Sequence, residues 1–299
     1  MKQKFLEATK NILEKNLNVL QGEVSFNDKR ECPGVEEPFI ENKFILVYDK
    51  NSKLSSILSE SYISNLESYK DLDIEVINFD EIDKNELKDK LLSLKEKSTV
   101  ILVQSTNFRL EDFRIRLSLH KNNVWCLEHN HLSYIKDKQI ENYADSIEYN
   151  TPYYNKLSGR LKNISDLASS LKIVCKNWDI LTLEWWFEDM KQNTWDYTWK
   201  KRGWTFPVWE NFTEILDFDR MNWKISIKVF PDKNFEVIFP EVFSLEIKQS
   251  KIISFSENTP KEFIEILENI KASEDNEIYC RELWFWLNRA ISFEKPLND

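Results

Sequence analysis

The three histidines, His120, His129 and His131, are the side chains best suited to metal binding or proton transfer, because imidazole is both a ligand and a base. His129 and His131 are two positions apart and follow an apolar run that is typical of a strand. Alternate residues of a strand point to one side, so the two rings could share a metal ion with Glu128. No third ligand stands at a recognisable spacing, and surface polar residues at a strand end are the favoured interpretation.

A second candidate is the polar segment 104–107, Gln-Ser-Thr-Asn, which follows an expected strand at 99–104. Free backbone N–H groups at such a strand end could hold an anion, with Arg109 pairing a phosphate or carboxylate. This would make the protein an enzyme with an anionic small-molecule site at Gln104 to Arg109. Ser, Thr and Asn are also preferred helix caps, and capping is the favoured role. Glycine-rich phosphate-binding motifs and a Gly-x-Ser-x-Gly elbow are absent from the sequence.

Composition gives the most unusual signal. The chain has 4 Gly and 11 Trp in 299 residues, whereas glycine usually makes up about 7% of a globular protein. Several tryptophans stand where a turn residue is expected, among them Trp195, Trp204, Trp209 and Trp223. We hypothesise UGA recoding, in which UGA codons for glycine, as some bacterial lineages use them, are translated here as tryptophan. The alternative is a Trp-rich, non-catalytic aromatic surface that binds carbohydrate or peptide.

Reading tryptophan as glycine changes two segments. Residues 202–214 become Arg-Gly-Gly-Thr-Phe-Pro-Val-Gly-Glu-Asn-Phe-Thr-Glu, and residues 281–291 become Arg-Glu-Leu-Gly-Phe-Gly-Leu-Asn-Arg-Ala-Ile. These resemble the two acidic metal-binding motifs of the aminopeptidase T-like metallopeptidases, a family of dimeric, two-metal leucyl-type aminopeptidases. The segments at 47–49, 104–109 and 128–132 are similar to that family too. The resemblance covers most of residues 44–298.

The resemblance implies that Glu210 and Glu282 are metal ligands for two divalent ions (Zn, Co or Mn), that peptides are the substrates, and that the protein is a homodimer. The metals would activate a bridging water and polarise the peptide carbonyl. Without the family, each glutamate is a lone acid that would be expected in solvent. The family's remaining ligands, two histidines and an aspartate, and its catalytic tyrosine come in later segments, which we expect beyond residue 299. We therefore expect no activity from this chain as a fragment with tryptophan at those positions.

Short apolar runs that alternate with helical segments must position these residues. This pattern predicts an α/β protein in which a doubly wound, mostly parallel sheet at 41–150 follows a leading helix and loop at 1–40. Residues 151–178 are predicted to form a linking helix, and 179–299 an incomplete α+β metallopeptidase-like domain. The expected strands of the first domain are 44–48, 74–79, 99–104 and 124–127, with helices through 54–69, 83–96 and 113–119.

The net charge and the cysteine pattern limit the partners and the cellular location that we expect. A net charge of −10 without a basic cluster argues against nucleic acid as a partner. The sequence has no long apolar stretch and no export signal, so we expect a cytoplasmic protein that does not bind membranes. Cysteines at 32, 126, 175 and 280 lack metal-binding spacing and fit reduced thiols.

Overall fold

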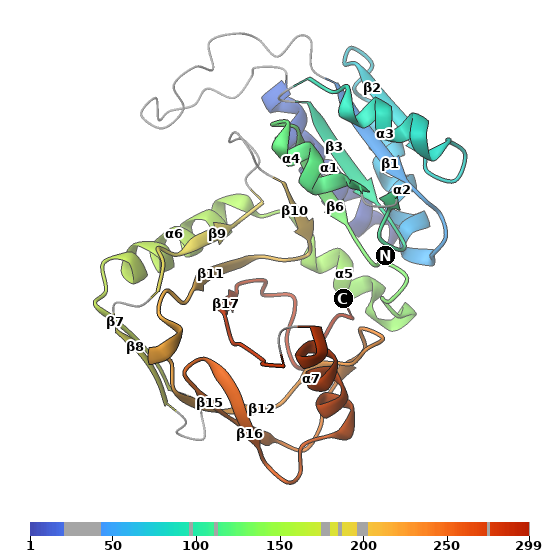
Figure 1. The fold of residues 1–299 in the computed structure, drawn as a ribbon. Coiled ribbons are helices and arrows are strands. Elements are labelled where there is room, and N and C mark those ends of the chain that lie inside the picture. Colours follow the sequence, from blue (N-terminus) through green and yellow to red (C-terminus); the bar gives the residue numbers. More distant parts are fainter. Residues whose placement is uncertain are drawn as a thin grey trace.

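The computed structural model describes residues 1–20, 43–95, 98–110, 113–174, 180–184, 187–195, 203–273 and 276–298. Four of the eleven tryptophans, Trp178, Trp185, Trp186 and Trp199, lie outside these residues, as do Cys32 and Cys175. The chain divides into a part built on one parallel sheet and a part built on small antiparallel sheets (Figure 1).

The parallel sheet confirms the predicted α/β class. Its five strands run in the order β10-β6-β3-β1-β2, and every neighbouring pair is parallel. This is the strand order of a doubly wound sheet. The strands are β1 (Phe44–Tyr48), β2 (Ile74–Asn78), β3 (Thr99–Val103), β6 (Trp125–His129) and β10 (Gly203–Phe206).

Two hydrophobic cores cover the two faces of this sheet, because successive strand residues point to opposite faces. Leu46 and Ile101 belong to the core that also contains α1 and α2, whereas Val47 and Leu102 belong to the core that contains α3 and α4. The helices are α1 (Lys2–Leu20), α2 (Lys53–Leu66), α3 (Lys84–Leu92) and α4 (Ile115–Lys121), and a short hairpin of β4 (Arg109–Leu110) and β5 (Phe113–Arg114) precedes α4.

The fifth strand, β10, comes from beyond the predicted domain boundary at residue 150. It pairs with β6, so that Thr205 lies beside Glu128 and Phe206 beside His129. After β6 the chain forms a 3-10 turn (Asp137–Gln139) and α5 (Ile140–Ser146), and then leaves the sheet through α6 (Thr151–Asp166). The chain therefore forms β7, β8 and β9 of the antiparallel part before it returns to the parallel sheet as β10.

The prediction of a linking helix over 151–178 is wrong in its second half. The helix ends at Asp166, and β7 (Ser170–Val174) pairs with β8 (Ile180–Glu184) in an antiparallel hairpin. The residues of β7 alternate between exposed and half-buried, which is the period of a strand with one covered face. The β-branched side chains of Ile173 and Val174 favour this conformation.

The antiparallel part contains a three-stranded sheet β17-β11-β9 and a second one of β12, β15 and β16, joined through a hydrophobic core around Ile215, Met221 and Leu283. The sequence pattern also predicts a hairpin over 243–255 with its turn at Gln249-Ser250, and a helix that opens at Thr259-Pro260, and both are present. The elements are β9 (Lys191–Asn193), β11 (Glu210–Glu214), β12 (Trp223–Ile227), β13 (Phe230–Pro231), β14 (Val237–Ile238), β15 (Phe243–Lys248), β16 (Lys251–Phe255), α7 (Lys261–Ser273) and β17 (Glu282–Trp286), with a 3-10 turn at Phe218–Arg220.

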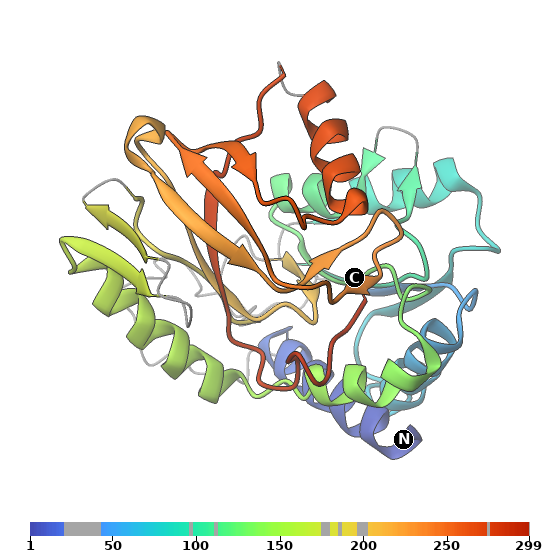
Figure 2. The same cartoon turned by 90° about the horizontal axis from the view of Figure 1, so that it is seen from below.

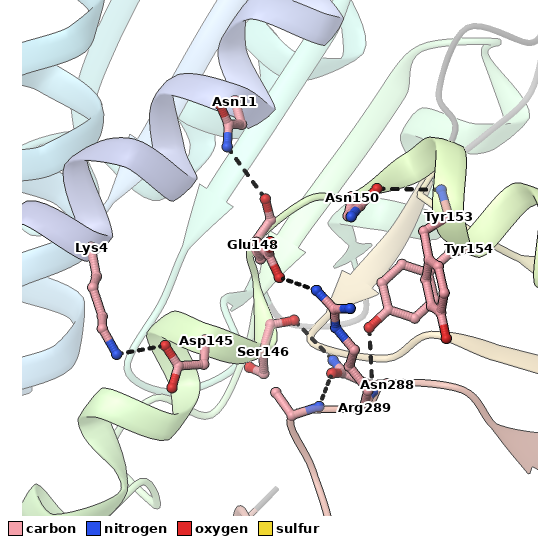
Figure 3. Close-up of polar contacts among 11 residues, drawn as sticks. Lys4, Asn11, Asp145, Ser146, Glu148, Asn150, Tyr153, Tyr154, Asn288 and Arg289 are labelled. Carbon is pink, nitrogen blue, oxygen red and sulfur yellow. Dashed lines mark hydrogen bonds and ion pairs between the residues drawn. The ribbon is translucent and has the colours of Figure 1, made fainter.

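The segment after β17 runs back to α5 and fastens the two parts together (Figure 2). The buried Asn288 amide donates to the carbonyls of Ser146 and Pro207, both at 2.8 Å, and so ties α5 to the turn after β10. Arg289 forms an ion pair with Glu148 at 2.9 Å (Figure 3). This segment also lines a groove of about 920 Å³ against α1 and α5.

Replacing Asn288 with Ala should lower the free energy of unfolding by about 1–3 kcal/mol, because two buried carbonyls lose their donor. Urea unfolding followed by circular dichroism measures this. The control is Arg289→Gln, whose solvent-exposed ion pair should contribute less than about 1 kcal/mol. Equal stability of the Asn288→Ala variant and the parent would show that the segment does not fasten the two parts.

Candidate functional site

Glu210, the first residue of β11, is the most unusual buried group in the described part of the chain. Its side chain is 0% exposed, and neither carboxylate oxygen has a hydrogen-bond partner among the described residues. A buried carboxylate without partners is costly, since its charge is neither hydrated nor neutralised. Such a group calls for an explanation in terms of a ligand or an ion.

The environment changes the acidity of Glu210. Burial raises the pKa of its carboxyl group to about 7, and the negative charge of Glu282 adds to this rise. Asn193, which pairs with Glu210 across β9 and β11, opposes it. The Asn193 amide also donates a hydrogen bond to the carbonyl of Val208, at 2.9 Å.

Glu282 lies on the neighbouring strand and on the same face of the sheet. Glu210 is paired with Trp286 and Glu214 with Glu282, so the two candidate ligands share a face but are four positions apart. At about 3.3 Å per residue, their α-carbons are separated by about 13 Å along the strands. Glu282 is exposed and accepts a hydrogen bond from the indole N–H of Trp284. The sheet thus orients both carboxylates the same way without placing them directly opposite each other.

Asn211 and Thr213, which alternate with Glu210 along β11, have structural contacts on the opposite face. The Asn211 side chain accepts from the Ser158 hydroxyl and donates to the Ser158 carbonyl at 3.0 Å, which holds β11 against α6. Thr213 donates to the carbonyl of Glu188 at 2.6 Å. Alternation along β11 therefore separates the residues that hold the strand in place from Glu210.

The described tryptophans divide into two groups. Trp284 and Trp286 are each 52% exposed on the same face of β17, and Trp195 has a positive φ of 51°, which is rare for a bulky side chain. Trp125 and Trp209 are buried, and so is Trp195. The indoles of Trp195 and Trp209 are in contact, with ring centroids 3.9 Å apart. Trp204 and Trp223 lie within the strands β10 and β12. The codon hypothesis predicts turns, positive φ or exposure, and three of the seven described tryptophans show a positive φ or exposure.

The histidine pair does not form a shared site in the structure. His129 is fully buried, and its two ring nitrogens lie 2.8 Å from the hydroxyls of Tyr62 and Tyr143. Glu128 points to the other face of the sheet, where it pairs with Arg116. His131 has a positive φ of 55° and its ring stacks on Tyr134. The expectation of surface polar residues is therefore wrong for His129, which is buried in the core, whereas His131 is half-buried.

His129 should make stability depend on pH. Burial lowers the pKa of its imidazole to about 3, so the folded state resists protonation, whereas the unfolded chain takes up a proton below a pH of about 6.5. The stabilisation is complete above that pH and is lost as the pH falls towards 3. Between pH 7 and pH 5 the loss should be about 2 kcal/mol.

Denaturant unfolding at several pH values measures this effect. The pH-dependent loss should be smaller by that amount in His129→Gln, and it should persist in His120→Gln, a matched variant on α4. An identical pH dependence in His129→Gln and the parent would mean that the ring is not held neutral by burial.

Local hydrogen bonds account for part of the polar segment that follows β3. The backbone N–H and the hydroxyl of Ser105 donate to the buried carboxylate of Asp49, at 2.7 and 2.8 Å. This network lies where β1 and β3 diverge, which is the usual ligand position of a doubly wound sheet. A small cavity is present beside it, at the carboxyl ends of β3 and β6. The side chain of Arg109, the residue predicted to pair with an anion, lies outside the described residues.

Among the described residues, no group of three or more His, Cys, Asp and Glu side chains is placed to hold a metal ion. The described helices include none that is both long and apolar enough to cross a membrane. The sequence pattern could not have revealed the burial of Glu210, because its neighbours Val208 and Asn211 do not distinguish a core strand from a loop.

Comparisons with known proteins show the fold and no family. No family model matches the chain, and no curated protein matches it. Among solved structures, it is similar to 2,5-dihydroxypyridine dioxygenase from Pseudomonas putida KT2440, with a TM-score of 0.61 at 11% sequence identity. The match covers 95% of this chain and 76% of the dioxygenase chain. At this identity the likeness extends to the fold alone.

Proposed function

We propose that this chain belongs to a metal-dependent aminopeptidase, a hydrolase that removes N-terminal residues from peptides, with Glu210 and Glu282 as metal ligands. The observation that carries the proposal is the buried, unpartnered carboxylate of Glu210 on the same sheet face as Glu282. A divalent cation would neutralise this carboxylate and take the place of its missing hydrogen bonds.

The donor set fits part of such a centre. Carboxylate oxygens bind divalent ions, and the metals, when bound, would supply an activated water and a polarised carbonyl. This chain's own contribution is to hold Glu210 at the start of β11 in a dry environment, where few competing groups surround it. Two carboxylates are too few for a tight transition-metal site, so imidazole and further carboxylate ligands must come from residues other than those described.

The codon hypothesis supports the same proposal, because indoles at 209, 284 and 286 flank both candidate ligands. With glycine at 284 and 286, the face between Glu210 and Glu282 would lose two large side chains. Inspection of the eleven tryptophan codons decides this point. We expect UGA at all of them, and UGG at most of them would refute the recoding.

The activity itself can be tested on the full product of the gene that encodes this chain, with glycine at the tryptophan positions. It should release N-terminal leucine from peptides only when Zn²⁺, Co²⁺ or Mn²⁺ is added. Glu210→Gln and Glu282→Gln should each reduce the rate by at least about 100-fold, because each removes an anionic ligand.

The matched control for these two variants is Glu214→Gln. Glu214 lies on the same face of β11 but forms an ion pair with Lys191, and its replacement should leave the activity within a few-fold of the parent. Cleavage without added metal, or full activity of both ligand variants, would contradict the proposal.

A second candidate function is favoured by one observation. Trp284 and Trp286 expose half of their surfaces on one face of β17, an arrangement that could stack on a sugar or a peptide side chain. If tryptophan is the natural residue there, a carbohydrate array should show binding that is lost in Trp284→Ala. The enzyme and the binding protein are distinguished by the codons at these two positions.

A further inference from the structure

We propose that the cavity at the carboxyl ends of β3, β6 and β10 binds a compact oxyanion, with Arg114 recognising its charge. This site lies in the parallel sheet and is independent of the carboxylates of β11 and β17. It overlaps the predicted anion site at Gln104 to Arg109 through Gln104 and Asn107, but its cation is Arg114, the residue that precedes α4.

The strands bring the lining residues together by their alternation. Leu102, Gln104, Glu128 and Asn130 occupy alternate positions along β3, β6 and their extensions, so they share the face that α4 covers. The cavity has a volume of about 170 Å³. Seven of its lining residues have polar side chains: Gln104, Asn107, Arg114, Arg116, Glu128, Asn130 and Thr205.

The charges of the lining favour an anion. The Glu128 carboxylate is buried, and the Arg116 guanidinium neutralises it, with Nε 2.6 Å from Oε1. The Thr205 hydroxyl donates to the same oxygen at 2.9 Å. Arg114 therefore leaves the lining with one excess positive charge. Guanidinium groups bind carboxylate and phosphate through paired hydrogen bonds, which makes an oxyanion the matching ligand.

Hydrogen bonds hold the wall opposite the arginines in place. The Gln104 amide accepts from the Phe108 N–H at 2.7 Å and donates to the side chain of Asn130. Gln104 is therefore not free to reorient, whereas Asn107 is exposed at the rim and can donate to a ligand. A fixed wall with a cationic rim is suited to a small, polar molecule.

The position and the size of the cavity narrow the class of ligand. Doubly wound sheets bind ligands outside the carboxyl ends of their strands, and here the crevice between β1 and β3 is closed by Asp49 and Ser105. The cavity lies on the neighbouring strands. Its volume equals that of about six water molecules, which is enough for phosphate or a short carboxylate.

Titration calorimetry of the purified protein tests the proposal, with inorganic phosphate and L-lactate as separate probes at low chloride. We expect saturable binding of at least one probe, and the tighter one identifies phosphate or carboxylate as the source of the oxyanion. Arg114→Gln should weaken binding at least 10-fold. The control, Arg160→Gln on the exposed side of α6, should leave it unchanged.

A double variant, Arg116→Met with Glu128→Gln, removes the buried pair together and avoids leaving one charge unpaired. It should leave binding within a few-fold of the parent, because the net charge of the lining is unchanged. Arg114→Gln with Asn107→Ala should instead abolish binding, while circular dichroism shows a folded protein. Absence of binding by both probes at 20 mM would overturn the proposal. A dissociation constant of 1 mM corresponds to a binding free energy of about 4.1 kcal/mol, so 20 mM is roughly the weakest affinity of interest. Unchanged affinity in Arg114→Gln would overturn it as well.

Discussion

The pairing of β10 with β6 is the interaction on which the rest of the structure depends. It brings a strand from the second half of the chain into the parallel sheet. The side chains of successive residues of that strand point to opposite faces, so β10 contributes contacts to both. Thr205 reaches Glu128 on one face, while the Phe206 ring stacks on His129 on the other, with centroids 4.4 Å apart. Because β11 begins four residues after β10 ends, the same pairing fixes where Glu210 enters the molecule.

The two buried glutamates, Glu128 and Glu210, differ in whether the fold supplies a partner for the carboxylate. Glu128 is matched by Arg116 and Thr205, so its charge is compensated inside the fold. Glu210 has no such partner among the described residues, and its raised pKa is the physical consequence. An unmatched buried acid lowers stability unless something binds it, which is why it supports a functional interpretation more strongly than an exposed acid would.

Glycine is scarce in this chain, and residues other than glycine occupy left-handed backbone positions. Left-handed positions are occupied by Asn123, Gln249 and Ser250 at turns, and by bulky residues such as Tyr149 and Trp195 in the interior. Asparagine tolerates this conformation because its short polar side chain can hydrogen-bond locally, whereas an aromatic side chain gains no such compensation. These two aromatic residues are joined by a hydrogen bond in the interior, in which the Tyr149 hydroxyl donates to the Trp195 carbonyl.

The sequence by itself determined the α/β class and nearly every element of the parallel sheet, because apolar runs alternating with helices bury both faces of such a sheet. It also indicated the 243–255 hairpin through the polar turn at Gln249-Ser250. It did not determine that Ser170–Val174 leaves the helix, or that β10 crosses back to the sheet, since both depend on partners distant in sequence. The tertiary structure alone decided that Glu210 is buried while Glu282 is exposed, because burial is set by which strands and segments pack over a residue.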